Sequence, residues 1–401
     1  MSKIYIWLIV LLPVLAQYKV GPLDLDVVLM AAFFLVTLIF RQTLTITPAG
    51  KTVLGIIGYI IIITVINIAV GQKFSPVSDI VLRMGRYCLY LFVVFVIGKD
   101  CFDYQDLMRV YRIVAYAAAI YIMIQAVFYY GAGVTLPNKI GGSSSGIKGE
   151  FGRLRSFYSE PAELGYNLTP FVACSLLGES KKAGKRSGSA DALLVSAAII
   201  LSTSGQGILC TAAVWALWLF LRIKRGEFKT KDIVLLVGIA IIAFVLYKFG
   251  VLKFALDRAG NTEEGGAMDA RSSGYDSLVL LSPLQRVFGA GFGNYVVENT
   301  YGLDLIYEFV NYSTVSEFLF TLGVCGVAIW LVFFGGVFFR GNLCTRTLII
   351  ALILLSMGGC PMTGKHFPLW LSLICVQLPA GYFKEKKEQE PKKTERGLSF
   401  E

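Results

Sequence analysis

One segment of the chain combines cations, carboxylates and a helix-start signal. It reads RLRSFYSEPAELGYN and begins at Arg153, with Arg155 two residues later. Pro161 suits the first turn of a helix, which places Glu160 at the N-cap and Glu163 at the third helical position. The free N–H groups and positive dipole end of such a helix attract anions. Arginines beside them favour binding of a pyrophosphate through paired hydrogen bonds.

The same segment supplies a candidate general base. Glu160 carries a carboxylate, which can accept the proton of an attacking sugar hydroxyl. Tyr158 lies two residues before it and is a candidate substrate contact. The alternative is purely structural: Glu160 and Glu163 cap the helix, and the arginines reach toward lipid headgroups.

Two further arginines lie within an apolar stretch. Arg83 and Arg86 are three residues apart in SDIVLRMGRYCLY and therefore share one helical face. Charges at that depth cost free energy and indicate a functional site by default. The alternative is that both side chains reach the headgroups, with Asp79 as a partner. We retain both arginines as candidate substrate-binding residues.

A long polar stretch before residue 312 holds more candidates. Arg271 and Arg286 are cations within it, and VFGAGFGNY follows Arg286 with alternating glycines and then Asn294. Glycine permits tight turns and close approach of the backbone to a ligand. The string does not follow a strand-then-helix pattern, so we reject a nucleotide loop. It is either a substrate-positioning turn that includes Asn294 or a plain bend.

The remaining candidates are single residues. Glu317 lies near the outer end of an apolar stretch, where substrate binding and a structural role are both open. His366 is the only histidine, which excludes a His-rich metal centre, and we expect it to be an ordinary interfacial residue. Most of the eight cysteines fall in apolar segments without a CxxC pair, so we expect packing residues, no metal and no cofactor.

The composition defines what surrounds these residues. The chain has 401 residues, of which 56% are hydrophobic and 16% charged, and its mean hydropathy is +0.66. Soluble domains carry about 25% charged residues, so this chain is typical of a membrane protein. The formal net charge of +10 does not indicate nucleic-acid binding, because the excess Lys and Arg lie in short loops between apolar segments.

The apolar segments predict an all-α polytopic membrane protein. With roughly 20 apolar residues per crossing, we expect about 12 transmembrane helices. Their approximate ranges are 4–16, 25–40, 53–70, 79–98, 110–130, 161–178, 190–204, 206–222, 232–250, 313–338, 346–360 and 366–382.

The loop charges predict the orientation. Lys and Arg concentrate in alternate loops, which places both termini in the cytoplasm. A transmembrane domain then covers residues 1–382, with external loops at about 131–160 and 251–312. Residues 383–401 form a charged tail that we expect to be disordered and cytoplasmic. An alternative at the start is signal-peptidase cleavage near Ala16.

The ordered segments resemble the O-antigen polymerase and ligase superfamily, which includes Wzy-type polysaccharide polymerases. The matching pieces are RLRSFYSEPAELGYN, LSTSGQGIL, the large loop containing Arg271, LSPLQRVFGAGFGNY and NYSTVSEFLFTLGVCGVAIWL. They cover roughly residues 150–335. Each piece is loose alone, and the specificity comes from their order and their placement relative to the apolar spans.

The resemblance implies a GT-C-like glycosyltransferase of the bacterial plasma membrane. Such a protein would join undecaprenyl-pyrophosphate-linked oligosaccharides on the external face into capsular, O-antigen or exopolysaccharide chains. Arg153, Arg155 and Arg271 occupy the places where relatives are thought to hold the pyrophosphate. A chain-length regulator and a flippase would be candidate partners. Because pyrophosphate is already a good leaving group, no nucleotide is needed.

This chain departs from the family pattern at two places. Many relatives carry Arg or Lys where Gln206 stands, and ligase-type members have a His where Asn311 and Tyr312 stand. The second departure favours a polymerase over a ligase that transfers finished polymer to an acceptor. A flippase or other transporter is a further alternative. It is disfavoured because the two halves of the chain are unlike and the polar residues concentrate on one face.

Overall fold

The computed structural model of the chain is mostly α-helical, with one short antiparallel ribbon that pairs β1 (Lys19–Val20) with β2 (Leu23–Asp24). The structure describes residues 2–40, 46–98, 103–139, 154–178, 188–230, 273–296, 310–379 and 382, and single positions between 232 and 253.

Within these ranges, five helices are long and apolar enough to cross a membrane. The prediction of a helical membrane protein is therefore supported at this level. These helices are α3 (Pro48–Ala69), α4 with the π-helical turn η1 (Val77–Ile97), α5 (Tyr104–Ala132), α8 (Gly205–Lys224) and α13 (Thr314–Arg340).

Shorter helices occupy most of the other expected spans. They are α1 (Ser2–Leu15), α2 (Leu25–Phe40), α6 (Pro161–Leu177), α7 (Gly188–Leu201), α14 (Leu343–Ser356) and α15 (Phe367–Cys375). The expected span 232–250 lies mostly outside the described residues, and so does the tail 383–401. The last expected span, 366–382, is shorter than predicted because its helix ends at Cys375.

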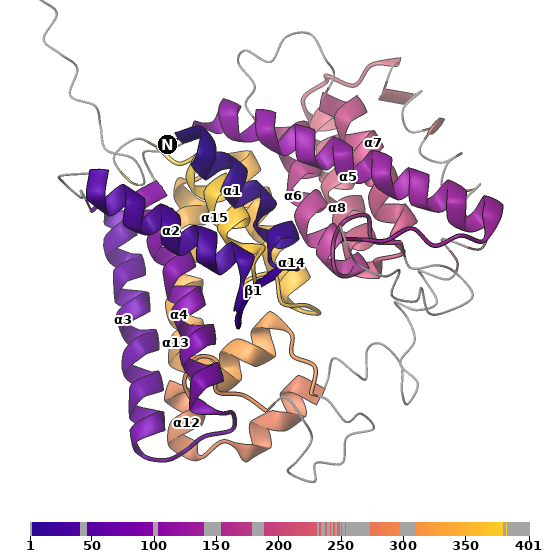
Figure 1. Cartoon of the computed structure of the whole chain (residues 1–401). Helices are drawn as coiled ribbons and strands as arrows, with labels where there is room; N and C mark the ends of the chain where they lie inside the picture. The colour runs from indigo at the N-terminus through magenta and orange to yellow at the C-terminus, as the bar shows by residue number, and fades with distance from the viewer. Residues whose placement is uncertain are drawn as a thin grey trace, which may run out of the picture.

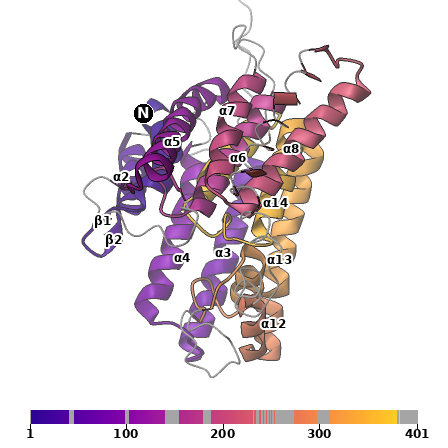
Figure 2. The ribbon, with the colours of Figure 1, turned by 90° about the vertical axis from the view of Figure 1, so that its right-hand side faces the viewer.

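The helices form two groups joined by a central set (Figure 1). The helices α3, α4 and α13 pack on one another at one side, and α5, α6, α7 and α8 pack together at the other. Between the groups, α14 contacts α6, α13 and α15. Figure 2 shows the same division from the side.

The centre of this arrangement is α15. All nine of its residues are buried, which explains why a short helix is apolar on every face. The ring of Phe367 lies 6.0 Å from Tyr87 of α4 and 5.5 Å from Trp330 of α13. The start of α15 is thereby fixed against the first helix group.

A non-helical segment packs against α13. The helix α13 itself breaks at Gly323 (φ 66°, ψ −175°). The N–H of Ala290 donates to the carbonyl of Phe320 at 2.9 Å, and the N–H of Gly291 donates to Thr321 at 2.9 Å. Irregular backbone among membrane helices is tolerated where protein groups satisfy it. The inserted segment, residues 289–296, follows the short helix α12 (Pro283–Phe288).

The alternating glycines explain how this insertion fits. Gly291 has φ 97°, and a Cβ there would lie 2.8 Å from the Cα of Thr64 in α3. Gly293 has φ 79°, and a Cβ there would lie 2.8 Å from the Cβ of Arg83 in α4. The glycines therefore allow the inserted segment to approach α3 and α4 closely. This agrees with the interpretation of VFGAGFGNY as a plain bend.

Candidate functional site

The helix predicted from the sequence around Pro161 is present. Pro161 is the first residue of α6 and Glu160 is its N-cap, as expected. The Glu160 side chain is exposed and makes no capping hydrogen bond. The backbone N–H groups of Ala162 and Glu163 in the first turn have no intrahelical partner, and Glu160 does not cap them. The predicted capping role of Glu160 is thus absent, while the predicted helix start is confirmed.

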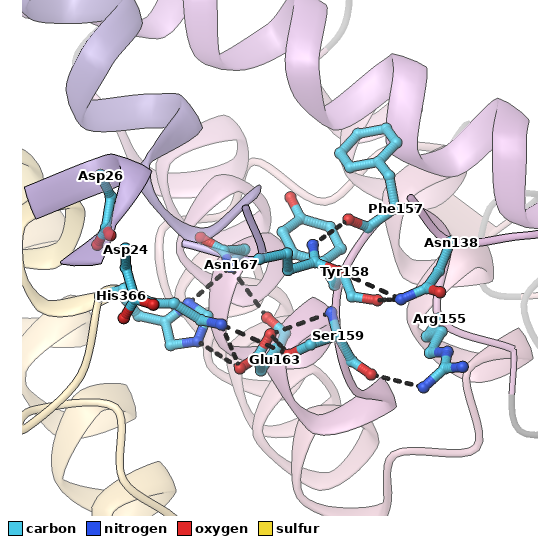
Figure 3. Close-up of polar contacts among 12 residues, drawn as sticks. Asp24, Asp26, Asn138, Arg155, Phe157, Tyr158, Ser159, Glu163, Asn167 and His366 are labelled. Atoms are coloured by element: carbon cyan, nitrogen blue, oxygen red, sulfur yellow. Dashed lines mark hydrogen bonds and ion pairs between the residues drawn. The ribbon is translucent and has the colours of Figure 1, made fainter. Parts of the chain in front are cut away.

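The Glu163 side chain accepts hydrogen bonds at the start of α6, as the sequence suggested. Its partners, however, are not those of a capping box. Its Oε2 accepts hydrogen bonds from the hydroxyl of Ser159 and, at 3.2 Å, from the Ser159 backbone N–H (Figure 3). Its Oε1 lies 2.8 Å from Nζ of Lys365 and 3.9 Å from Nε2 of His366. Glu163 therefore joins the start of α6 to the start of α15.

His366 is not an ordinary interfacial residue, because only 3% of it is exposed. The Nδ2 group of Asn167 donates to the carbonyl of Glu163 at 3.1 Å and to Nδ1 of His366 at 2.7 Å. Since Nδ1 accepts this bond, the neutral ring carries its proton on Nε2, which faces Glu163. We call Glu163, Lys365, His366 and Asn167 the Glu163 cluster.

The loop before α6 brings Arg155 to the edge of this cluster. Nη1 of Arg155 donates to the carbonyl of Ser159 at 2.7 Å (Figure 3). Tyr158 is buried in the hydrophobic core, and burial raises the pKa of its hydroxyl well above the usual range. Its backbone carbonyl accepts a bond from Asn138 at 2.9 Å. Tyr158 thus anchors the loop to the hydrophobic core. This buried position does not favour the predicted contact with substrate.

A second cluster forms around Glu317 in the first turn of α13. Only 6% of Glu317 is exposed, and the side chains of Thr363 and Cys360 lie beside its carboxylate. Arg83 and Arg86 act on its carboxylate electrostatically. We call these five residues the Glu317 cluster. The sequence named three of them as candidates, and the structure brings those three together.

The two arginines of this cluster are held by defined partners. Nη1 of Arg83 donates to the carbonyl of Gly293 at 3.2 Å, and its guanidinium lies 4.5 Å from the ring centroid of Tyr295. Nη1 of Arg86 lies 3.1 Å from Oδ2 of Asp24. Both arginine side chains are half-buried. Asp24 is the carboxylate that pairs with this face of α4, whereas the alternative interpretation had named Asp79.

The segment between α14 and α15 links the two clusters. It reads MGGCPMTGKH and supplies Cys360 and Thr363 to one cluster and Lys365 and His366 to the other. Glu160 acts electrostatically on both Cys360 and His366, so its exposed carboxylate lies between the clusters. Sequence reasoning missed this segment. Its signal was a Gly- and Pro-rich stretch with reactive side chains between two apolar helices.

The segment between α14 and α15 also determines which helix ends meet. The N–H of Thr314 in α13 donates to the carbonyl of Gly359 at 2.7 Å. A side chain at Gly359 would collide with Tyr166 of α6, whose hydroxyl donates to Oε1 of Gln206 in α8 at 3.2 Å. The starts of α6, α8, α13 and α15 therefore gather at one end of the bundle, the site end.

The remaining candidates lie elsewhere. Asn294 is fully buried, and its amide bonds the backbone of Phe74, Gln72 and Ala290, so it ties the inserted segment together and has no polar group left for substrate. The Arg286 side chain is exposed and forms no hydrogen bond or ion pair with any described residue. Arg153 and Arg271 lie outside the described residues.

The described residues contain no group of three or more His, Cys, Asp or Glu side chains that could hold a metal ion. No protein-family model matches the chain, and no curated protein matches its sequence. What the protein does is therefore argued from the geometry of the site end.

Proposed function

We propose that this protein is a membrane glycosyltransferase that polymerises undecaprenyl-pyrophosphate-linked oligosaccharides. In this proposal about twelve helices form a GT-C-like domain in the bacterial plasma membrane, both termini are cytoplasmic, and the site end faces outward. One observation carries it: Arg155 and Lys365 both contact Ser159, the residue before the exposed Glu160, at the uncapped start of α6. Cations beside a carboxylate suit transfer from a diphosphate to a hydroxyl.

The diphosphate would lie at the start of α6. Arg155 and the N–H groups of Ala162 and Glu163 can donate to its oxygens, and the helix dipole favours its charge. Lys365 adds a second cation within reach of Ser159 (3.5 Å). Arg153 and Arg271, which the sequence predicts for the same task, remain part of the proposal.

The reaction then needs one bond broken and one formed. The bond between the anomeric carbon and the diphosphate oxygen breaks, and its electron pair leaves with the diphosphate. The acceptor hydroxyl oxygen bonds to that carbon, and its proton passes to Glu160. Holding both substrates in line and neutralising the leaving group are contributions that a protein can make without a cofactor.

Glu160 suits the role of base better than the other two carboxylates. Glu163 is already bound by Lys365, His366 and Ser159. Glu317 is buried beside uncharged groups. The side chain of Glu160 is exposed and forms no hydrogen bond with any described residue. A base has to touch the acceptor hydroxyl, and of these three carboxylates only that of Glu160 is both exposed and unbonded.

The Glu317 cluster provides a second cationic face for the second lipid-linked substrate. Arg83 and Arg86 lie at the same end of the bundle and are half-buried rather than fully enclosed. A polymerase needs two such faces, because both its donor and its acceptor carry a diphosphate. This pairing favours polymerisation over transfer to an acceptor without that group.

Deletion of the gene tests the proposal. Single repeat units should accumulate on the undecaprenyl carrier, facing outward, and the ladder of polymer lengths should vanish. Accumulation of long chains would instead identify a ligase, and repeat units trapped on the inner face would identify a flippase. Unchanged lipid-linked sugars would remove the protein from this chemistry altogether.

A further inference from the structure

Two helices that follow α6 diverge along its surface. The helices α7 and α8 each pack on α6 more extensively than on each other, as Figure 2 illustrates. The divergence leaves a groove between them with a volume of about 300 Å³. Its lining comprises Leu193, Ser196, Ala197, Ile199, Ile200, Ile208, Thr211, Ala212, Trp215, Ala216 and Leu219.

The walls of the groove are almost entirely apolar. Its few polar side chains bond one another or their neighbours: Nε1 of Trp215 donates to Oγ of Ser196 at 2.9 Å, and Ser196 in turn donates to a carbonyl of its own helix. The hydroxyls of Thr211 and Thr169 lie 3.3 Å apart. These residues therefore leave no hydrogen-bond donor pointing into the groove. We expect the ligand of the groove to be a saturated or isoprenoid chain rather than a sugar.

One end of the groove lies near the site end. Gln206 in the first turn of α8 bonds Tyr166, whose ring centroid lies 5.6 Å from that of His366. The groove begins two residues further on, at Ile208. From there to Leu219 it extends about 16 Å along α8, at 1.5 Å of rise per residue.

We propose that this groove holds the first isoprene units of the polyprenyl chain whose diphosphate lies at the start of α6. The identity of the head group rests on the proposed function, whereas the groove does not. Lipid tails are as apolar as the groove, so its walls alone select little between one chain and another. Selection comes from the diphosphate, which positions a polyprenyl chain here rather than the acyl chain of an ordinary phospholipid.

Two neighbouring alanines provide a matched pair of variants. Ala212 lines the groove, and Ala213 is the next residue on α8 but is exposed and absent from the lining. A212F fills the groove, while A213F adds the same ring beside it. Ala216 lines the groove one turn further along and provides A216L as a second filling variant, in case A212F does not fold.

The measurement is photo-crosslinking of purified full-length protein in phospholipid nanodiscs. The probe is polyprenyl diphosphate with a diazirine on the second isoprene unit. Wild type and A213F should be labelled on α7 or α8, and a folded groove-filling variant should show at least a tenfold reduction. Unlabelled polyprenyl diphosphate should displace the probe. Equal labelling of all variants, displacement by phosphatidylglycerol alone, or labelling confined to other helices would overturn the proposal.

This experiment separates the groove from the reaction, because labelling requires no turnover. Labelling with the expected pattern in a protein whose deletion leaves polymer unchanged would keep the groove as a polyprenyl diphosphate site and discard the polymerase. Loss of polymer on deletion, without labelling of α7 or α8, would keep the polymerase and discard the groove.

Discussion

The Glu163 and Glu317 clusters place similar side chains at one end of the bundle, yet they hold them in opposite ways. Glu163 has a side chain that is 17% exposed, and Lys365 neutralises it at 2.8 Å. Glu317 is 6% exposed, and the side chains beside its carboxylate are the uncharged Thr363 and Cys360. The first carboxylate is balanced by direct charge pairing, and the second by arginines that are themselves fixed to other groups.

Their supports differ as well. The Glu163 cluster depends on a helix start that local sequence specifies, through Pro161 and the residues around it. The Glu317 cluster depends on the inserted segment, whose Gly293 carbonyl binds Arg83. A change in side-chain charge should therefore damage the first cluster most, and a change in backbone freedom should damage the second.

Gly291→Ala tests the backbone side of this comparison and has the largest expected effect. A positive φ and a contact with the Thr64 backbone should together destabilise the protein by about 4 kcal/mol. Thermal unfolding in detergent measures this. Gly58→Ala is the control, because Gly58 lies within α3 with nothing near its Cβ position, and it should stabilise slightly. Equal unfolding temperatures for the two variants would contradict the glycine argument.

Glu160→Gln changes the carboxylate that lies between the two clusters. It distinguishes a role in catalysis from a role in stability. Because Glu160 is exposed and makes no capping bond, we expect unchanged thermal stability. The rate of polymerisation in proteoliposomes should fall by about 100-fold, since a base is lost. A wild-type rate would exclude Glu160 as the base, and a large fall in stability would give it a structural role.

Arg155→Ala addresses the cationic edge of the Glu163 cluster. Loss of a guanidinium from a diphosphate site should reduce polymer formation by about 100-fold or somewhat less, while the protein stays in the membrane. Arg109→Ala is the control, because Arg109 forms an exposed pair with Asp106 in the first turns of α5. Ladder length and protein level on the same membranes are the readouts, and normal ladders from Arg155→Ala would remove its assignment.

Glu163→Gln tests the charge-paired side of the comparison. It leaves Lys365 without its carboxylate, and stability should fall by about 2 kcal/mol. Removing the lysine charge as well, in the Glu163→Gln/Lys365→Gln double variant, should recover much of that loss. Additive losses in this double-mutant cycle would show that the 2.8 Å pair has no net coupling.

Glu317→Gln should have the smallest effect. The amide keeps one acceptor oxygen and removes a buried charge, so we expect a stability change below about 1 kcal/mol. The lost charge near Arg83 and Arg86 should slow polymerisation by about tenfold. A destabilisation as large as that of Glu163→Gln would show that the two carboxylates are held in the same way after all.

Much of the fold was predictable from local sequence. Runs of apolar residues marked the helices, because a chain surrounded by lipid or core has to satisfy its backbone within the helix. Pro161 and Glu160 correctly marked the start of α6, since proline fixes φ and lacks the N–H that a first turn leaves unused. The short helix α12 also begins at a feature that is local in the sequence, the capping box between Ser282 and Gln285.

Other features depended on contacts between distant residues. Asn294 and Tyr158 looked like substrate contacts, but one ties the inserted segment and the other fills the core. His366 looked ordinary, yet Asn167 and Glu163, some 200 positions earlier in the chain, surround it. Nothing in the local spacing of these residues indicates which of them meet.

The sequence alone therefore determined that this chain forms apolar helices and that a carboxylate and cations lie at the start of α6. Hydropathy and helix-start signals depend on contiguous residues, so they can be interpreted without a fold. Only the tertiary structure decided that α15 brings Lys365 and His366 to Glu163, and that a glycine-lined insertion fixes Arg83. Both depend on which helix ends pack together, and that is set by side-chain contacts between residues far apart in the chain.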